Sequence, residues 1–205
     1  MTDAVVTANN GDEIEAEAAR RAIEEKTYGF WIGLTSDAIV FALLCAIFVA
    51  MAHGTADGPA GDTLFRLPRI FAQTVLLLAS SATFGFAGVA IAAGRSRRAV
   101  LWLGVTFLLG LGFISAEIAE LYSMAAADAG PSRSGYLSAF FTLIGTYGAH
   151  VSVGLVWIVL LGCEVGLRGI TPFATSRVYR LGLFWHFLVI VWINIFSLVY
   201  LPGLL

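Results

Sequence analysis

The stretch Ser138–Leu161, SAFFTLIGTYGAHVSVGLVWIVLL, decides the fold of this chain. It is long enough to cross a hydrocarbon core of about 30 Å as a helix, which takes roughly 20 residues. One ionisable side chain, His150, lies near its centre among small residues. A buried imidazole among small side chains is typical of a membrane helix that packs closely within a bundle. We therefore expect the other apolar stretches to be its packing partners.

The composition extends this expectation to the whole chain. Of its 205 residues, 59% are hydrophobic and only 13% are charged. A soluble domain of this length needs more charged surface. The charges gather near the N-terminus and in short gaps between five apolar stretches. The sequence thus predicts an all-α integral membrane protein, a five-transmembrane-helix bundle with spans at about 30–52, 70–93, 99–124, 136–164 and 181–203.

The predicted organisation has two parts. Residues 1–28 form a cytoplasmic N-terminal tail or surface helix, with a capping signal at Asn10 or Asp12. Residues 29–205 form the membrane domain. Between its last two spans, the segment 167–180 is predicted to be a basic loop, broken by Gly169 and Pro172.

The basic residues indicate the orientation. With five spans, nine of the 12 Lys and Arg residues fall on one side, and the other three, Arg66, Arg69 and Arg133, fall on the opposite side. By the positive-inside rule the N-terminus is cytoplasmic and the C-terminus periplasmic. The net charge of −2 gives no indication of nucleic-acid binding. Residues 1–10 are polar, so we expect no cleavable signal peptide.

The candidate site consists of ionisable groups within the spans. A charge at membrane depth is costly, so each group is expected to face protein, water or a partner, either for function or as a neutral hydrogen-bonded link between helices. Glu117 is expected to be hydrogen-bonded within the bundle, whereas the shallower Glu120 is expected to be solvated. The full set is Asp37, Glu117, Glu120, His150 and His186.

A carboxylate–imidazole pair would offset the cost of burying either group alone. Asp37 could be level with His150 or with His186, and we favour His150. A helical projection of Ser138–Leu161 puts Tyr147 on the face of His150, so Tyr147 is an alternative partner. The small residues predicted to support close helix packing are Gly145, Gly148, Ser152 and, on the histidine's face, Gly154.

Metal and haem sites have little support in the sequence. A bis-histidine haem formally needs only His150 and His186 to face each other. However, the chain has three histidines in total and neither a His-x-x-His nor a Cys-x-x-Cys motif. Cys45 and Cys163 lie in separate spans, where a buried cysteine usually acts as a small hydrophobic residue. We therefore expect no catalytic residue, no cofactor and no metal in this chain.

Several strings, in order, resemble subunit III of the haem–copper respiratory oxidases. They begin with Gly29-Phe30-Trp31 and Ser36-Asp37, and continue through Glu117 and Glu120. The later ones are Gly135-Tyr136-Leu137-Ser138-Ala139-Phe140-Phe141, then Gly145, Gly148, His150-Val151 and Gly154, and finally Trp185-His186-Phe187. The five-span length and the strings SRSGYLSAFF and LFWHF are similar to the bo-type ubiquinol-oxidase branch of bacteria.

Two positions depart from the family pattern. Tyr147 stands where a second histidine is common, and Val189 where an aspartate is common. Both differences remove a polar group from the bundle. Asp37 matches a position where many relatives carry a reactive intramembrane glutamate.

The resemblance implies a non-catalytic accessory subunit in the bacterial inner membrane. The haems and copper would lie in subunit I, and the complex would pass electrons from ubiquinol to oxygen while moving protons outward. The implied partners are subunit I, mainly, with subunits II and IV in a hetero-oligomer. Phospholipid would bind between the helices.

Two alternatives fit the same sequence. Subunit III of a cytochrome c oxidase, or a related accessory protein, would share the same strings, because the choice of electron donor is made elsewhere. A stand-alone carrier or proton channel could use Asp37, Glu117 and the histidines. The chain lacks the internal repeats and broken helices that carriers use.

Overall fold

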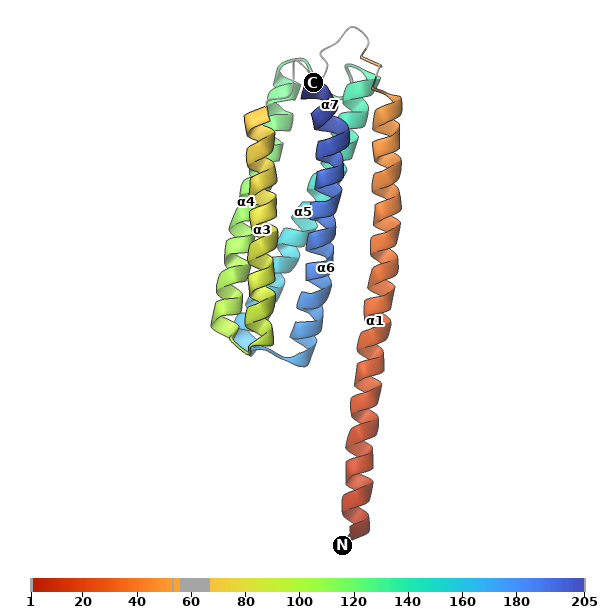
Figure 1. Cartoon of the computed structure of the whole chain (residues 1–205), viewed down its shortest axis with the longest axis vertical. Helices are drawn as coiled ribbons and strands as arrows, with labels where there is room; N and C mark the ends of the chain where they lie inside the picture. The colour runs from red at the N-terminus through yellow and green to blue at the C-terminus, as the bar shows by residue number, and fades with distance from the viewer. Residues whose placement is uncertain (1, 53, 56–66, 205) are drawn as a thin grey trace. The chain divides into compact units, whose positions relative to one another are not determined.

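The computed structural model describes residues 2–52, 54–55 and 67–204, with side chains from residue 25 to 202 except those at 26, 53 and 56–66. The described residues form helices and no strands (Figure 1). Contacts divide the chain into two compact units, Met1–Asp37 and Ala38–Leu205.

Five helices are long and apolar enough to cross a membrane, which confirms the predicted number of spans. They are α1 (Thr2–Ala50), α3 (Leu67–Ala92), α4 (Ser96–Ala126), α5 (Gly135–Arg168) and α6 (Pro172–Ile195). A five-residue π-helix, η1 (Phe196–Tyr200), and the short α7 (Leu201–Leu204) continue α6. The protein is therefore a multi-pass membrane protein. α1 has no break at the predicted boundary between residues 28 and 29.

The segment 167–180 is mostly helical, so the prediction of a loop there was wrong. α5 ends at Arg168, where Gly169 takes φ +74, and α6 begins at Pro172 rather than near Leu181. Thr171 caps α6 by accepting a hydrogen bond from the Ala174 N–H at 3.1 Å. Proline suits the first turn of a helix because it has no N–H to leave unpaired. Gly169 and Pro172 thus mark a three-residue turn, and the basic residues Arg177 and Arg180 lie on α6.

Four helices form a closed ring in which α3 packs on α4, α4 on α5, α5 on α6 and α6 on α3. Large aromatic side chains fill its centre. Gly154 of α5 allows close approach of α6, since a Cβ there would lie 2.8 Å from the Trp185 ring. The largest fully buried side chains are Trp185, Trp192, Tyr147, Tyr200, Phe113 and Phe140.

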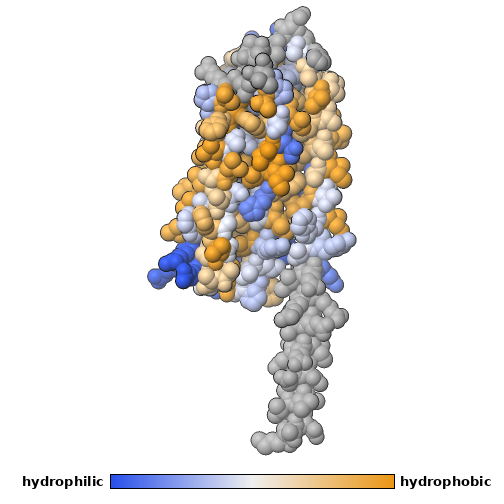
Figure 2. Space-filling view, viewed as in Figure 1, coloured by the Kyte–Doolittle hydropathy of each residue, from blue (hydrophilic) through white to orange (hydrophobic). Residues whose placement is uncertain are grey.

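Within the larger unit, the C-terminal part of α1 adds to this ring through aromatic contacts. Phe41 lies with its ring centroid 5.0 Å from that of His150, and Phe48 lies 5.3 Å from Tyr136. The outer surface of the helices is largely apolar (Figure 2). In this view hydrophilic side chains gather at the end of the bundle that carries the turn between α3 and α4. An apolar surface of this extent fits contact with lipid or with other membrane helices.

Candidate functional site

A deeply buried cluster that contains two carboxyl groups is formed by Gln73 of α3 with Glu117 and Glu120 of α4. The two glutamates are three residues apart and so share a helix face. Gln73 Nε2 donates to Glu117 Oε2 at 3.2 Å and to Glu120 Oε2 at 3.1 Å. The three residues are only 1%, 2% and 4% exposed, respectively. We call these three residues the acid–amide cluster.

The cluster corrects one expectation and supplies a residue that sequence reasoning missed. Glu120 is buried instead of solvated, because α3 and α4 are antiparallel neighbours and Gln73 covers it. Gln73 carries no charge, so a search for intramembrane charges passes over it. The signal was available, since two carboxyl groups on one buried face require a hydrogen-bond donor from a neighbouring helix.

Tyr147 is fully buried and its hydroxyl donates to the Leu188 carbonyl of α6 at 3.1 Å. Its ring packs edge-on against Phe113 and lies beside Trp192. Tyr147 therefore links α5 to α6. Further links between helices run from Trp185 Nε1 to Ser80 Oγ at 3.1 Å and from Trp192 Nε1 to Thr74 Oγ1 at 3.0 Å.

The two histidines of the spans have different surroundings. His150 Nδ1 lies 2.8 Å from the Thr146 carbonyl of its own helix, and its ring packs against Phe41 and Phe184. His186 is exposed, and its Nδ1 lies 2.7 Å from Ser81 Oγ on α3. Among the described residues no group of three or more His, Cys, Asp or Glu side chains could hold a metal ion.

Asp37 lies on α1 at the end of the smaller unit and is half-buried. The pairing of Asp37 with His150 or His186 stays a prediction.

The four small residues predicted for close packing on α5 divide into two groups. Gly154 meets Trp185 and Phe184, and a Cβ on Gly148 would lie 3.3 Å from Ile114 Cδ1. Gly145 and Ser152 are exposed, and in the described part of the chain nothing lies within 4 Å of a Cβ built on Gly145. The Ser152 hydroxyl donates to the Gly148 carbonyl of its own helix. In this chain, Gly154 makes the tight contact.

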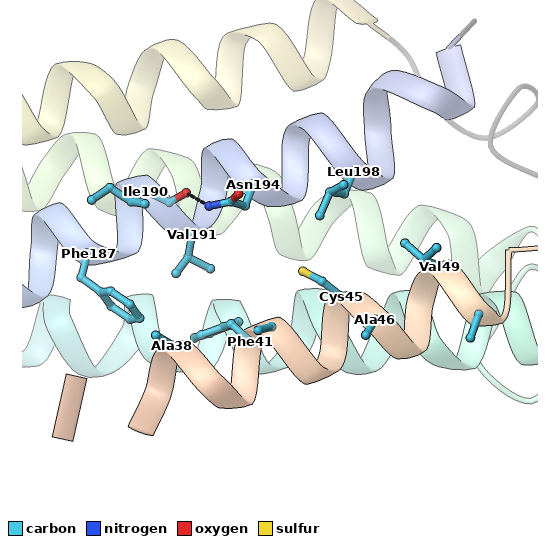
Figure 3. A pocket seen from close by; sticks show the side chains of 12 residues that line it. Ala38, Phe41, Cys45, Ala46, Val49, Phe187, Ile190, Val191, Asn194 and Leu198 are labelled. Atoms are coloured by element: carbon cyan, nitrogen blue, oxygen red, sulfur yellow. Dashed lines mark hydrogen bonds between the residues drawn. The ribbon is translucent and has the colours of Figure 1, made fainter. Parts of the chain in front are cut away.

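An apolar groove lies between the C-terminal part of α1 and α6 with η1 (Figure 3). Its volume is about 660 Å³. Phe41 and Phe187 lie at one end, Val49 and Leu198 at the other, and Asn194 is the polar residue along its side. The Asn194 amide donates to the Ile190 carbonyl at 2.9 Å. The groove can hold a long apolar molecule.

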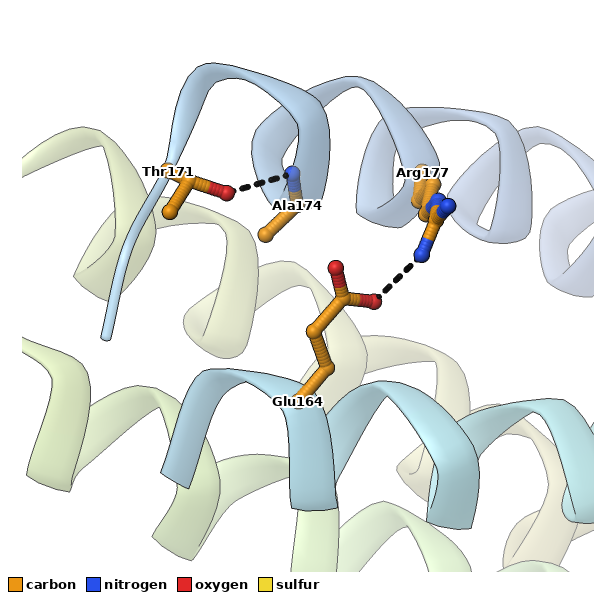
Figure 4. A network of polar contacts seen from close by, with 4 residues as sticks. All are labelled: Glu164, Thr171, Ala174 and Arg177. Atoms are coloured by element: carbon orange, nitrogen blue, oxygen red, sulfur yellow. Dashed lines mark hydrogen bonds and ion pairs between the residues drawn. The ribbon is translucent and has the colours of Figure 1, made fainter. Parts of the chain in front are cut away.

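A separate ion pair, between residues of α5 and α6, lies outside the acid–amide cluster (Figure 4). Arg177 Nη1 lies 2.8 Å from Glu164 Oε2, and the side chains are 52% and 18% exposed, respectively. Thr171, which caps α6, lies nearby in the same turn.

Comparison with known proteins gives a consistent result. Residues 14–204 match the family described as cytochrome c oxidase subunit III. The chain is 47% identical to a cytochrome bo(3) ubiquinol oxidase subunit 3 of Pseudomonas aeruginosa, over 87% of this chain and 85% of the relative. It is 39% identical to a quinol oxidase subunit 3 of Bacillus subtilis, over 94% and 92%. It is 37% identical to a cytochrome c oxidase subunit 3 of Alkalihalophilus pseudofirmus, over 97% of each.

Proposed function

The chain belongs to the cytochrome c oxidase subunit III family, and we propose that it is the accessory subunit III of a ubiquinol oxidase of the haem–copper type. The observation that carries the proposal is the 47% identity to a ubiquinol oxidase subunit 3 over 87% of the chain. In this role the chain stabilises the haem-bearing subunit I and carries no redox centre itself. Subunits II and IV complete the assembly.

The arrangement of polar groups supports a structural role. Tyr147 donates to a backbone carbonyl, and Trp185 and Trp192 donate to side-chain hydroxyls of α3. His150 and His186 lie against Thr146 and Ser81, respectively. The contacts between helices fix those helices relative to one another, and all of them, including that of His150 within α5, offset the cost of placing polar groups in an apolar bundle.

Deletion of this chain tests the proposal. The remaining complex should keep its haem spectrum and its initial rate of ubiquinol oxidation, but lose activity sooner during turnover. Complementation with the wild-type chain is the control. Loss of haem from a complex that still contains its other subunits would contradict the accessory role.

A cytochrome c oxidase is the second candidate, because a relative with that name aligns over 97% of the chain. Electron donors separate the two. The complex that copurifies with a tagged form of this chain should oxidise ubiquinol, and oxidation of reduced cytochrome c instead would favour the second candidate.

We also propose that the groove of Figure 3 holds a phospholipid acyl chain. Its apolar lining and its volume of about 660 Å³ support this ligand. Ala42 lines the groove, whereas the neighbouring Leu43 is outside its lining and exposed. Ala42→Trp should reduce the phospholipid that copurifies, measured by mass spectrometry, and Leu43→Trp should not. Equal lipid content in both variants would exclude the groove.

The location proposed for the chain is the bacterial inner membrane, with the N-terminus in the cytoplasm. The excess of Lys and Arg on one side supports this orientation. Single cysteines introduced at Ser96 and Ser132, in a variant without Cys45 and Cys163, provide the test. An impermeant thiol reagent added to intact cells should label the cysteine at 132 and not that at 96, and the reverse pattern would invert the orientation.

A further inference from the structure

The acid–amide cluster has a buried acceptor that its described neighbours leave unpaired. Gln73 Nε2 is shared between Glu117 and Glu120, while Gln73 Oε1 is buried and has no hydrogen-bond partner among the described residues. Buried polar atoms are almost always hydrogen-bonded. A donor is therefore needed at this position, on the same amide group that holds both carboxyl groups.

The charges around the cluster do not balance two ionised glutamates. The cation Arg69 of α3 attracts the Glu120 carboxylate electrostatically. The hydroxyls of Tyr147 on α5 and Tyr200 on η1, both neutral, also face the pair. Two buried carboxylates close together repel each other, and one cation offsets one of them. Glu117 faces no cation of its own among these groups.

A proton on one carboxyl group resolves both problems. It removes the second negative charge, and the carboxylic acid O–H becomes the donor that Gln73 Oε1 lacks. The opposite assignment of the amide also requires protonation, of two carboxyl groups instead of one. If Gln73 Oε1 faced the glutamates, each contact would require a protonated carboxyl group, because a carboxylate cannot donate a hydrogen bond.

We propose that the acid–amide cluster is a buried proton-binding site, in which Glu117 holds one proton toward Gln73 and Glu120 stays ionised toward Arg69. When the site takes up its proton, an O–H bond forms on the Glu117 carboxylate and an O–H bond of a hydronium ion breaks, leaving the carboxylic acid and water. The site joins α3 to α4 and is independent of the accessory role proposed above.

Infrared spectroscopy of the full chain, purified in lipid at neutral pH, tests the proposal. The spectrum should contain the C=O stretching band of one protonated carboxyl group, shifted in D₂O. Glu117→Gln should abolish the band. Glu120→Gln should keep it at a shifted frequency, and the control Glu164→Gln should leave it unchanged.

Two further measurements cover the case in which Glu117→Gln fails to fold. The wild-type band should fall with rising pH as a single-proton titration, and Gln73→Leu should shift its frequency. A wild-type spectrum without a protonated-carboxyl band at neutral pH would overturn the proposal. A band that appears only when Na⁺ or K⁺ is withdrawn would also overturn it, because the site would then bind a cation.

Discussion

The acid–amide cluster and the Glu164–Arg177 pair place carboxyl groups in opposite circumstances. Glu117 and Glu120 are almost fully buried and share the neutral amide of Gln73. Glu164 has a guanidinium at 2.8 Å, the shorter contact, but the Arg177 side chain is 52% exposed. An exposed ion pair contributes little, because water competes for both charges, whereas a buried acceptor is costly when its donor is lost. The shorter contact distance therefore does not identify the region that contributes more to stability.

The largest effect is expected from Gln73→Leu. This change removes the donor to two buried carboxyl groups, so we expect a loss of about 3 kcal/mol in the free energy of unfolding. A denaturing-detergent titration of the purified chain measures it. Replacing Gln73, Glu117 and Glu120 together by Leu should recover much of the loss, because no polar group is then left unpaired. If Gln73→Leu lowers the free energy of unfolding no more than Arg177→Gln does, burial does not make the acid–amide cluster the more important region for stability.

Gly154→Leu is expected to cost about 2 kcal/mol, because the added side chain enters the space of the Trp185 ring. It tests whether tight packing of α5 on α6 supports the buried region. The matched control is Gly145→Leu on the exposed side of the same helix, which should change stability little. Similar losses in the same titration for both variants would show that the contact with Trp185 does not set the cost at Gly154, since leucine is the better helix former at both positions.

Tyr147→Phe should cost about 1 kcal/mol, because it deletes one buried hydrogen bond and keeps the ring. Tyr122→Phe, at an exposed position of α4, serves as the control and should be neutral. Thermal unfolding followed by circular dichroism measures both. An unchanged unfolding midpoint for Tyr147→Phe would show that this hydrogen bond contributes as little to stability as the exposed Glu164–Arg177 pair.

The smallest effect is expected from Arg177→Gln, with a loss of about 0.5 kcal/mol or less at low salt. Added salt should erase the difference from wild type, because exposed charges are screened. The same unfolding titration at two ionic strengths provides the measurement. A larger loss that persists at high salt would show that Glu164 depends on Arg177 as strongly as Glu117 depends on Gln73.

The five spans could be predicted from the sequence because hydropathy and length are properties of each segment alone. The predicted start of the last helix, near residue 181, is wrong for the same reason, because hydropathy marks the apolar part of a helix and not its end. The charges of Arg177 and Arg180 favour a loop in the hydropathy pattern, yet a helix can continue past the apolar core and carry charges at its end. The cap at Thr171 and the proline after it were the better guides.

The candidate site was less predictable, since it depends on which helices are neighbours. Glu117 and Glu120 could be placed on one face, but the depth of Glu120 along its helix did not reveal that Gln73 covers it. Helical angles on α5 separated two faces without deciding which one meets α6. Gly154 makes that contact, and Gly145 remains exposed in this chain.

The π-helix at Phe196–Tyr200 changes the register of the chain. Leu201 N bonds to the Phe196 carbonyl, five residues back, so positions five apart come to lie on one side. In a continuous α-helix, Tyr200 would be rotated by about 140° from Ile195. Instead both are fully buried, and Tyr200 reaches Trp192 and Phe140. One inserted residue is thus accommodated near the end of the last span. Deleting a single residue between Ile195 and Tyr200 should restore a continuous α-helix, with Tyr200 four residues after Ile195 and rotated from it by only about 40°, so Tyr200 should stay buried.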